Sequence, residues 1–184
     1  MPTSGHLALD FAEKLLGGWD DAPYKLERRE SSLKIIPIPA NTFAVTLYDE
    51  GDQCMIAAQR WHTHYDEPNQ AAFCALWLLT PYYRLVEEFK GGLMVATWIE
   101  RYEAEGWIGM EPAYFLNPEY PPDWQAGPDE RYTLRITQQA LVSSPEPYEN
   151  IAPGAQLDEN GLPLGSHLGV STTENREPIG PTLF

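Results

Sequence analysis

The sequence predicts an α+β domain, with an antiparallel sheet of about five to seven strands and two helices packed on one face. Three observations point to this class. Several segments alternate apolar and polar residues, short turn sequences join them, and few segments have helical periodicity. We expect residues 1–141 to form this domain and residues 142–184 to form an extended C-terminal arm, because the arm is rich in Pro and Gly and poor in large apolar residues.

The first predicted element is an amphipathic helix from Ser4 to Leu16. Leu7, Phe11 and Leu15 recur at helical spacing and form one apolar stripe. Gly17 follows the last apolar residue and ends the helix. We expect this helix to pack on the sheet.

Three strands are predicted next. Tyr24 to Glu30 alternates as an exposed edge strand, whereas Pro37 limits Leu33 to Ile38 to an edge or a strand end, because proline cannot donate to a ladder. Phe43 to Tyr48 alternates over its whole length. The acidic residues 49–52 then form a turn, so this strand should pair as an antiparallel hairpin with the one that follows.

Residues Gln53 to Tyr65 are predicted to form one long strand. Its beginning is apolar on both faces, so we expect that part to be buried in the centre of the sheet. Its two predicted faces are Cys54, Ile56, Ala58, Arg60, His62 and His64 on one side and Met55, Ala57, Gln59, Trp61 and Tyr65 on the other.

A short buried helix is predicted from about Glu67 to Leu79, because its residues are almost all apolar. Asp66 is suited to cap the N-terminus of this helix, and Pro68 fits its first turn. A hairpin follows, with strands from Tyr82 to Phe89 and from Leu93 to Tyr102. Two further strands are predicted at Trp107 to Met110 and at Arg131 to Thr137.

The chain of 184 residues has 27 acidic and 12 basic residues, which gives a net charge of −15. This charge disfavours direct binding to nucleic acid, because such affinity comes from Lys and Arg that release counterions. No apolar run is long enough to cross a membrane, and the N-terminus has no export signal. Cys54 and Cys74 lie in apolar contexts typical of free thiols. We therefore expect a cytoplasmic protein without a membrane partner or a cofactor.

The most suggestive chemical pattern is His62-Thr63-His64-Tyr65-Asp66. Because the two histidines are two residues apart on a predicted strand, their imidazoles face the same side, as zinc ligands do. The pattern His-x-His-x-Asp resembles the opening of the metal motif of metallo-β-lactamases, with Glu67 where that family has another His. The resemblance implies a zinc site in a small hydrolase. In the alternative interpretation, the histidines are polar residues at a sheet rim, hydrogen-bonded to neighbouring carboxylates.

The segment from Tyr102 to Glu130 contains acidic and aromatic residues but no Lys or Arg. Aromatic side chains supply contact area, and carboxylates can meet Arg or Lys, so this composition suits an interface with a basic protein. Sugar binding and simple covering of the sheet are the alternatives. The predicted partner-binding residues are Trp107, Glu111, Tyr114, Phe115, Glu119, Tyr120, Asp123 and Trp124.

The sequence contains no nucleophile elbow, no phosphate-binding loop and no dinucleotide-binding motif. We therefore expect a non-enzymatic acidic binding protein, of the inhibitor, immunity or assembly type, that docks a basic protein partner. The first alternative is the small metal-dependent hydrolase. The second is a structural subunit whose arm, residues 142–184, wraps a neighbouring copy in a homo-oligomer.

Overall fold

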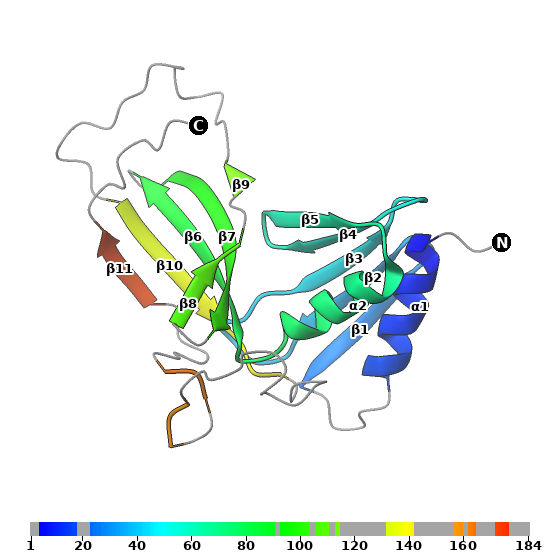
Figure 1. The fold of residues 1–184 in the computed structure, drawn as a ribbon, viewed down its shortest axis with the longest axis horizontal. Coiled ribbons are helices and arrows are strands. Elements are labelled where there is room, and N and C mark those ends of the chain that lie inside the picture. Colours follow the sequence, from blue (N-terminus) through cyan, green and yellow to red (C-terminus); the bar gives the residue numbers. More distant parts are fainter. Residues whose placement is uncertain are drawn as a thin grey trace, which may run out of the picture.

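The computed structural model describes residues 4–17, 23–90, 93–103, 106–110, 113–114, 132–141, 157–159, 162–164 and 172–176. Within these ranges the chain forms helices and antiparallel sheets, so the predicted α+β class is confirmed (Figure 1). The strands are divided between two sheets, whereas the sequence predicted one. Both helices lie on one face of the first sheet, as predicted.

Sheet A is built from five strands that neighbour one another in sequence order. They are β1 (Tyr24–Arg29), β2 (Ser32–Pro37), β3 (Val45–Asp49), β4 (Cys54–Ala58) and β5 (Trp61–Tyr65). As predicted, β1 lies at an edge, and Pro37 ends β2 opposite Tyr24. At a strand end, the missing N–H donor of the proline costs little.

The predicted long strand from Gln53 to Tyr65 is wrong, because the chain reverses and forms the β4–β5 hairpin. Gln59, in the turn, has a φ of 56°, the left-handed conformation that tight hairpin turns use. Ala58 pairs with Trp61 across the hairpin, and both are buried. Trp61 therefore lies on the buried face with Ala58, and not on the opposite face as a continuous strand would require.

Helix α1 (Ser4–Leu16) packs on sheet A through a face that contains small residues. The fully buried residues of this face are Ala8, Leu9, Ala12 and Leu16. The predicted stripe of Leu7, Phe11 and Leu15 lies beside this face, and Leu7 is 45% exposed. Alanine at the contact lets the helix approach the sheet closely, and the larger side chains are then directed to its flank.

Helix α2 (Pro68–Trp77) lies beside α1 on the same face of sheet A. Pro68 occupies the first turn, as predicted. The predicted N-cap at Asp66 is wrong, because Glu67 holds the N-cap position and its side chain makes no capping hydrogen bond. Since Pro68 begins the helix, the residue immediately before it becomes the cap, and Asp66 stays outside the helix.

Sheet B has the strand order β11-β10-β6-β7-β8, and β9 also pairs with β7. Its strands are β6 (Tyr83–Lys90), β7 (Leu93–Glu103), β8 (Gly106–Gly109), β9 (Ala113–Tyr114), β10 (Tyr132–Gln138) and β11 (Thr172–Arg176). The hairpin of β6 and β7 and the strands β8 and β10 confirm the predicted elements. β9 and β11 were not predicted.

The C-terminal arm contacts the chain's own domain wherever the structure describes it. β11 pairs with β10, and Leu157 packs against the main hydrophobic core. The backbone of Leu164 accepts a hydrogen bond from Trp107 Nε1 and donates one to the Tyr102 hydroxyl, each at 3.3 Å. The wrapping of a neighbouring copy by this arm stays a prediction.

A buried amide joins the two sheets where β10 ends. The side chain of Gln139 is 1% exposed, accepts the Phe43 N–H at 3.3 Å and donates to the Leu78 carbonyl at 2.8 Å. The neighbouring Gln138 donates to the Pro81 carbonyl at 2.5 Å. The end of β10 is thereby fixed both to the segment that leads into β3 and to the C-terminal end of α2.

We predict that Gln139→Ala lowers the free energy of unfolding by about 1–3 kcal/mol, because a buried N–H and a buried carbonyl lose their partner. Denaturant titration of the two proteins measures the difference. Gln70→Ala, at an exposed position of α2, is the matched control and should change stability by less than about 0.5 kcal/mol. If Gln139→Ala leaves the free energy of unfolding unchanged, the stabilising role of this amide is contradicted.

Candidate functional site

His62 and His64 lie on β5 with exposed side chains. Their ring centroids are 5.7 Å apart, and the rings meet edge to face. His64 Nε2 lies 3.2 Å from the Glu50 Oε2 atom. The two imidazoles therefore share one face of the strand, and one of them contacts a neighbouring carboxylate, as the structural interpretation of these histidines expects.

Asp66 follows β5 and is exposed. Within the ranges that the structure describes, no group of three or more His, Cys, Asp or Glu side chains is placed to hold a metal ion. His62, His64 and Asp66 are therefore not assembled into such a group. A catalytic zinc site needs about three protein ligands and one open position. Among the described residues, two imidazoles are available to the hydrolase interpretation, and no third ligand is placed beside them.

Most of the predicted partner-binding residues lie outside the described residues. These are Glu111, Phe115, Glu119, Tyr120, Asp123 and Trp124. Tyr114 is described only by its backbone, which pairs with β7. Trp107 is the one member of the predicted set whose side chain the structure places.

Trp107 contacts its own sheet. Its ring lies 5.1 Å from that of Tyr102, and the Arg84 guanidinium stands 4.2 Å above its ring centroid. Its indole N–H donates to the Leu164 carbonyl. These contacts make Trp107 a structural link between β8, β6 and the arm. Its part in binding a partner stays a prediction.

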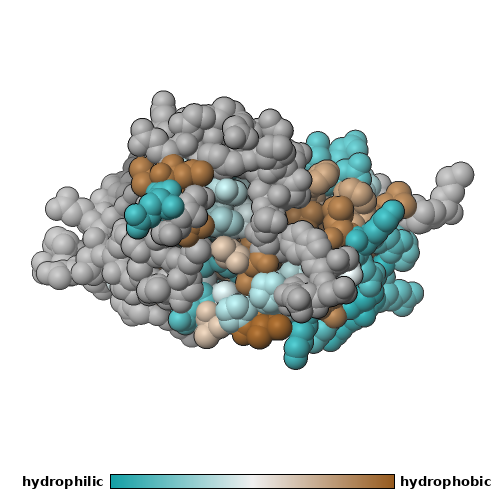
Figure 2. Space-filling view, turned by 90° about the horizontal axis from the view of Figure 1, so that it is seen from below, coloured by the Kyte–Doolittle hydropathy of each residue, from teal (hydrophilic) through white to brown (hydrophobic). Residues whose placement is uncertain are grey.

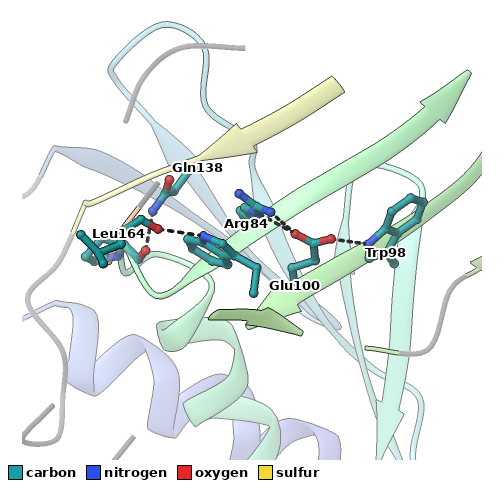
Figure 3. Close-up of polar contacts among 7 residues, drawn as sticks. Arg84, Trp98, Glu100, Gln138 and Leu164 are labelled. Carbon is teal, nitrogen blue, oxygen red and sulfur yellow. Dashed lines mark hydrogen bonds and ion pairs between the residues drawn. The ribbon is translucent and has the colours of Figure 1, made fainter. Parts of the chain in front are cut away.

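The carboxylate of Glu100 is held from two sides by the same part of sheet B (Figure 3). Arg84 donates to Glu100 Oε2 from Nε at 2.6 Å and lies 2.5 Å from it through a second nitrogen. Trp98 Nε1 donates to the other oxygen, Oε1, at 3.1 Å. Since both oxygens already have partners, this acid is a poor site for docking a cation from another protein.

Other acids of sheet B are also neutralised within the fold. Glu87 is 3% exposed, and its Oε2 accepts from Arg135 Nε at 2.6 Å. Arg101 pairs with Glu103 in the same way. Arg84, Arg101 and Arg135 therefore each compensate a carboxylate of the same sheet.

A set of exposed acids gathers at one end of sheet A. The register places Asp49 opposite Cys54, and Cys54 opposite Tyr65, so the β3–β4 turn and the β5–α2 connection share that end. We name four exposed residues there the acidic rim: Glu50, Asp52, Asp66 and Glu67. The sequence showed them only as a turn and a helix start, and the hairpin register is the feature that brings them together.

Both helices begin beside the acidic rim. Gly5 in the first turn of α1 donates its N–H to the Gly51 carbonyl, and a Cβ on Gly5 would lie 2.6 Å from Asp49 Cα. Only glycine permits this close approach. The N-terminus of a helix carries a partial positive charge that favours nearby carboxylates, so the fold tolerates the crowded acids. Among the described residues, Glu50 contacts His64, whereas Asp52, Asp66 and Glu67 make no ion pair.

A buried group of weak acids lies between the two sheets. Burial raises the pKa of the Cys74 thiol to about 11, although a hydrogen bond with Tyr65 lowers it. Burial also raises the pKa of Tyr83 to about 12, and it raises the pKa of Tyr65. Cys54 and Cys74 are free and buried. Neither cysteine has the depressed pKa of a reactive thiolate, so this group is structural.

Comparison of the chain with protein families, with curated proteins and with solved structures gave no match. Within the described ranges, no helix has both the length and the apolar character needed to cross a membrane.

We predict that the free energy of unfolding decreases as pH rises from about 9 to about 12. The ordinary pKa values of Cys74 and Tyr83, 9.0 and 10.0, are raised in the folded chain, which therefore holds these protons more tightly than the unfolded chain. The resulting stabilisation is complete below the unfolded pKa values and is lost as pH rises through the folded ones. Urea titrations across this range measure the trend, and Cys74→Ala should give a shallower slope. A flat profile would contradict the prediction.

We predict that the chain carries no stoichiometric zinc that depends on His62 and His64, because two imidazoles do not complete a catalytic site. Native mass spectrometry of protein purified without chelator, alongside the His62→Ala/His64→Ala variant, tests this. One zinc per chain that the variant loses would overturn the prediction and favour the hydrolase.

Proposed function

We propose that this chain is a non-enzymatic acidic binding protein that docks a basic protein partner in the cytoplasm, as an inhibitor, immunity or assembly protein does. The acidic rim is the observation that carries the proposal. Its four exposed carboxylates are Glu50, Asp52, Asp66 and Glu67, and three of them have no ion-pair partner in the described part of the chain.

The distribution of the arginines supports this proposal. Arg28 pairs with Asp10 and Glu13, and three arginines of sheet B, Arg84, Arg101 and Arg135, pair with carboxylates of the same sheet. These cations are thus engaged within the fold, while the chain keeps a net charge of −15. A basic partner that approaches the rim meets three carboxylates that have no ion-pair partner among the described residues. Such complementarity accelerates encounter and suppresses binding of acidic proteins.

The acidic aromatic segment from Tyr102 to Glu130 remains a proposed second contact of the same partner. The carboxylates of this segment that are predicted to bind the partner, Glu111, Glu119 and Asp123, lie outside the described residues. The proposal for them depends on composition alone, because the segment has no cation to balance its carboxylates.

We predict that Asp66→Asn/Glu67→Gln weakens binding of the basic partner about threefold to tenfold at low salt, because exposed ion pairs contribute modestly. The partner is first identified by native mass spectrometry of the gently purified chain, and its affinity is then measured by calorimetry at several salt concentrations. The difference between parent and variant should shrink above about 0.15 M salt, where surface charges are screened.

The matched control is Glu27→Gln/Glu159→Gln, which removes the same charge from two exposed positions away from the rim. This control should bind like the parent chain. Charge reversal of Glu111, Glu119 and Asp123 tests the second contact in the same assay. A retained partner that is not basic, or an affinity that is independent of salt and of all these acids, would refute the proposed function.

A further inference from the structure

The helix layer carries an apolar stripe that packs against the core on one side and that the core buries only in part. We name five residues on it the helix stripe: Leu7, Phe11 and Leu15 of α1, and Phe73 and Trp77 of α2. Leu7 is 45% exposed, and the other four are partly exposed. An apolar surface of this kind on a charged protein marks an interaction site more often than isolated apolar residues do.

Aromatic contacts hold the helix stripe together across both helices. The Phe11 and Phe73 rings meet edge to face at 5.7 Å, and Phe73 stacks on Trp77 at 6.2 Å. Trp77 in turn stacks at 6.1 Å on Tyr83, which is 3% exposed and belongs to β6. The row of rings is therefore anchored in the core at one end, so its exposed part is rigid before any partner binds.

The surroundings of the helix stripe are suited to an apolar partner. All ten residues of α2 are uncharged. The Trp77 indole nitrogen is buried without a hydrogen-bond partner in the described residues, and its ring is held by stacking and by packing against the core. In the view from below, hydrophobic side chains lie beside hydrophilic ones in the half of the molecule that carries sheet A and its helices, and other hydrophobic side chains are visible in the centre and in the half that carries sheet B (Figure 2).

The helix stripe leads to the acidic rim. Both helices begin at the rim, and the contact of Phe11 with Phe73 shows that they run side by side from it. Asp66 and Glu67 thus lie at one end of a surface whose middle is apolar. Apolar anchors at helical spacing with charge at one end are what an amphipathic helix presents to a groove between two helices.

We propose that the helix stripe and the acidic rim together bind an amphipathic helical segment of the basic partner. The segment has apolar side chains at i, i+3 or i+4, and i+7 on one face, and Lys or Arg residues at the end that meets Asp66 and Glu67. This inference rests on the proposed function and adds to it the place and the form of the contact.

Charge argues against a second copy of this chain as the occupant. Each copy carries a net charge of −15, so two copies that associate through the helix stripe repel each other. Like charges brought together cost binding free energy. A basic segment is instead attracted by the negative charge of the chain.

Two synthetic peptides of about 18 residues, both made of Leu, Ala and Lys, test the inference. In the first, the Leu residues share one helical face and the Lys residues cluster at one end. The second has the same composition in an order that scatters the Leu residues around the helix. Calorimetry with the full chain should show tighter binding of the first peptide.

The decisive variant is Leu7→Ser, which removes the most exposed side chain of the helix stripe. It should weaken binding of the first peptide about tenfold, because an apolar contact of this size is lost. Ile108→Ser is the matched control, since Ile108 is 44% exposed and lies on β8 of sheet B. This control should leave the affinity within about twofold.

Three results would overturn the inference: equal binding of the two peptides, equal losses in Leu7→Ser and Ile108→Ser, or a dimer of the chain that Leu7→Ser dissociates. If Asp66→Asn/Glu67→Gln weakens both peptides equally while Leu7→Ser weakens neither, the proposed function stands and the helical contact is refuted. If salt and the rim variant have no effect on a peptide that Leu7→Ser weakens, the stripe binds helices and the proposed function fails.

Discussion

The buried amide of Gln139 is the contact on which the arrangement of the two sheets depends. It satisfies the Phe43 N–H on one side and the Leu78 carbonyl on the other, and both groups are removed from water. A buried polar group is costly when it is unpaired, so the amide specifies one relative position of β10, α2 and the segment before β3. With these elements in place, Tyr83 of β6 can stack on Trp77 of α2. The aromatic row of the helix layer thus depends on the junction between the sheets.

The two sheets differ in whether their carboxylates form ion pairs. In sheet B, Glu87 pairs with Arg135 and Glu100 pairs with Arg84. Sheet A leaves exposed acids at the end where both helices begin, and the helix N-termini offset part of the repulsion between them. Arg28, Arg84, Arg101 and Arg135 are engaged by carboxylates of the fold, so these four cations do not balance the acids of the rim. The negative charge that remains is consistent with the proposed docking of a basic partner.

In the helix layer, the close packing of α1 on sheet A is linked to the partial exposure of the helix stripe. Small residues, Ala8 and Ala12, occupy the contact of α1 with sheet A, so this helix approaches the sheet closely. Its larger side chains Leu7 and Phe11 then lie beside that contact, and Phe11 meets Phe73 of α2. The same sequence pattern therefore gives close packing of α1 against the sheet and leaves side chains between the two helices partly exposed. The proposed helical contact involves these partly exposed side chains.

Local pattern determined the class of the fold, both helices, the β6–β7 hairpin and the shared face of His62 and His64, because helical and strand periodicities act over neighbouring residues. It did not determine the reversal at Gln59, since a strand that continues and a strand that folds back have the same alternation until the turn. That reversal moved Trp61 to the buried face. Only the tertiary structure decided that the strands form two sheets, that Glu100 is neutralised, and that Asp52 and Glu67 share one rim. These features depend on register between distant segments, which the periodicity of a single segment does not specify.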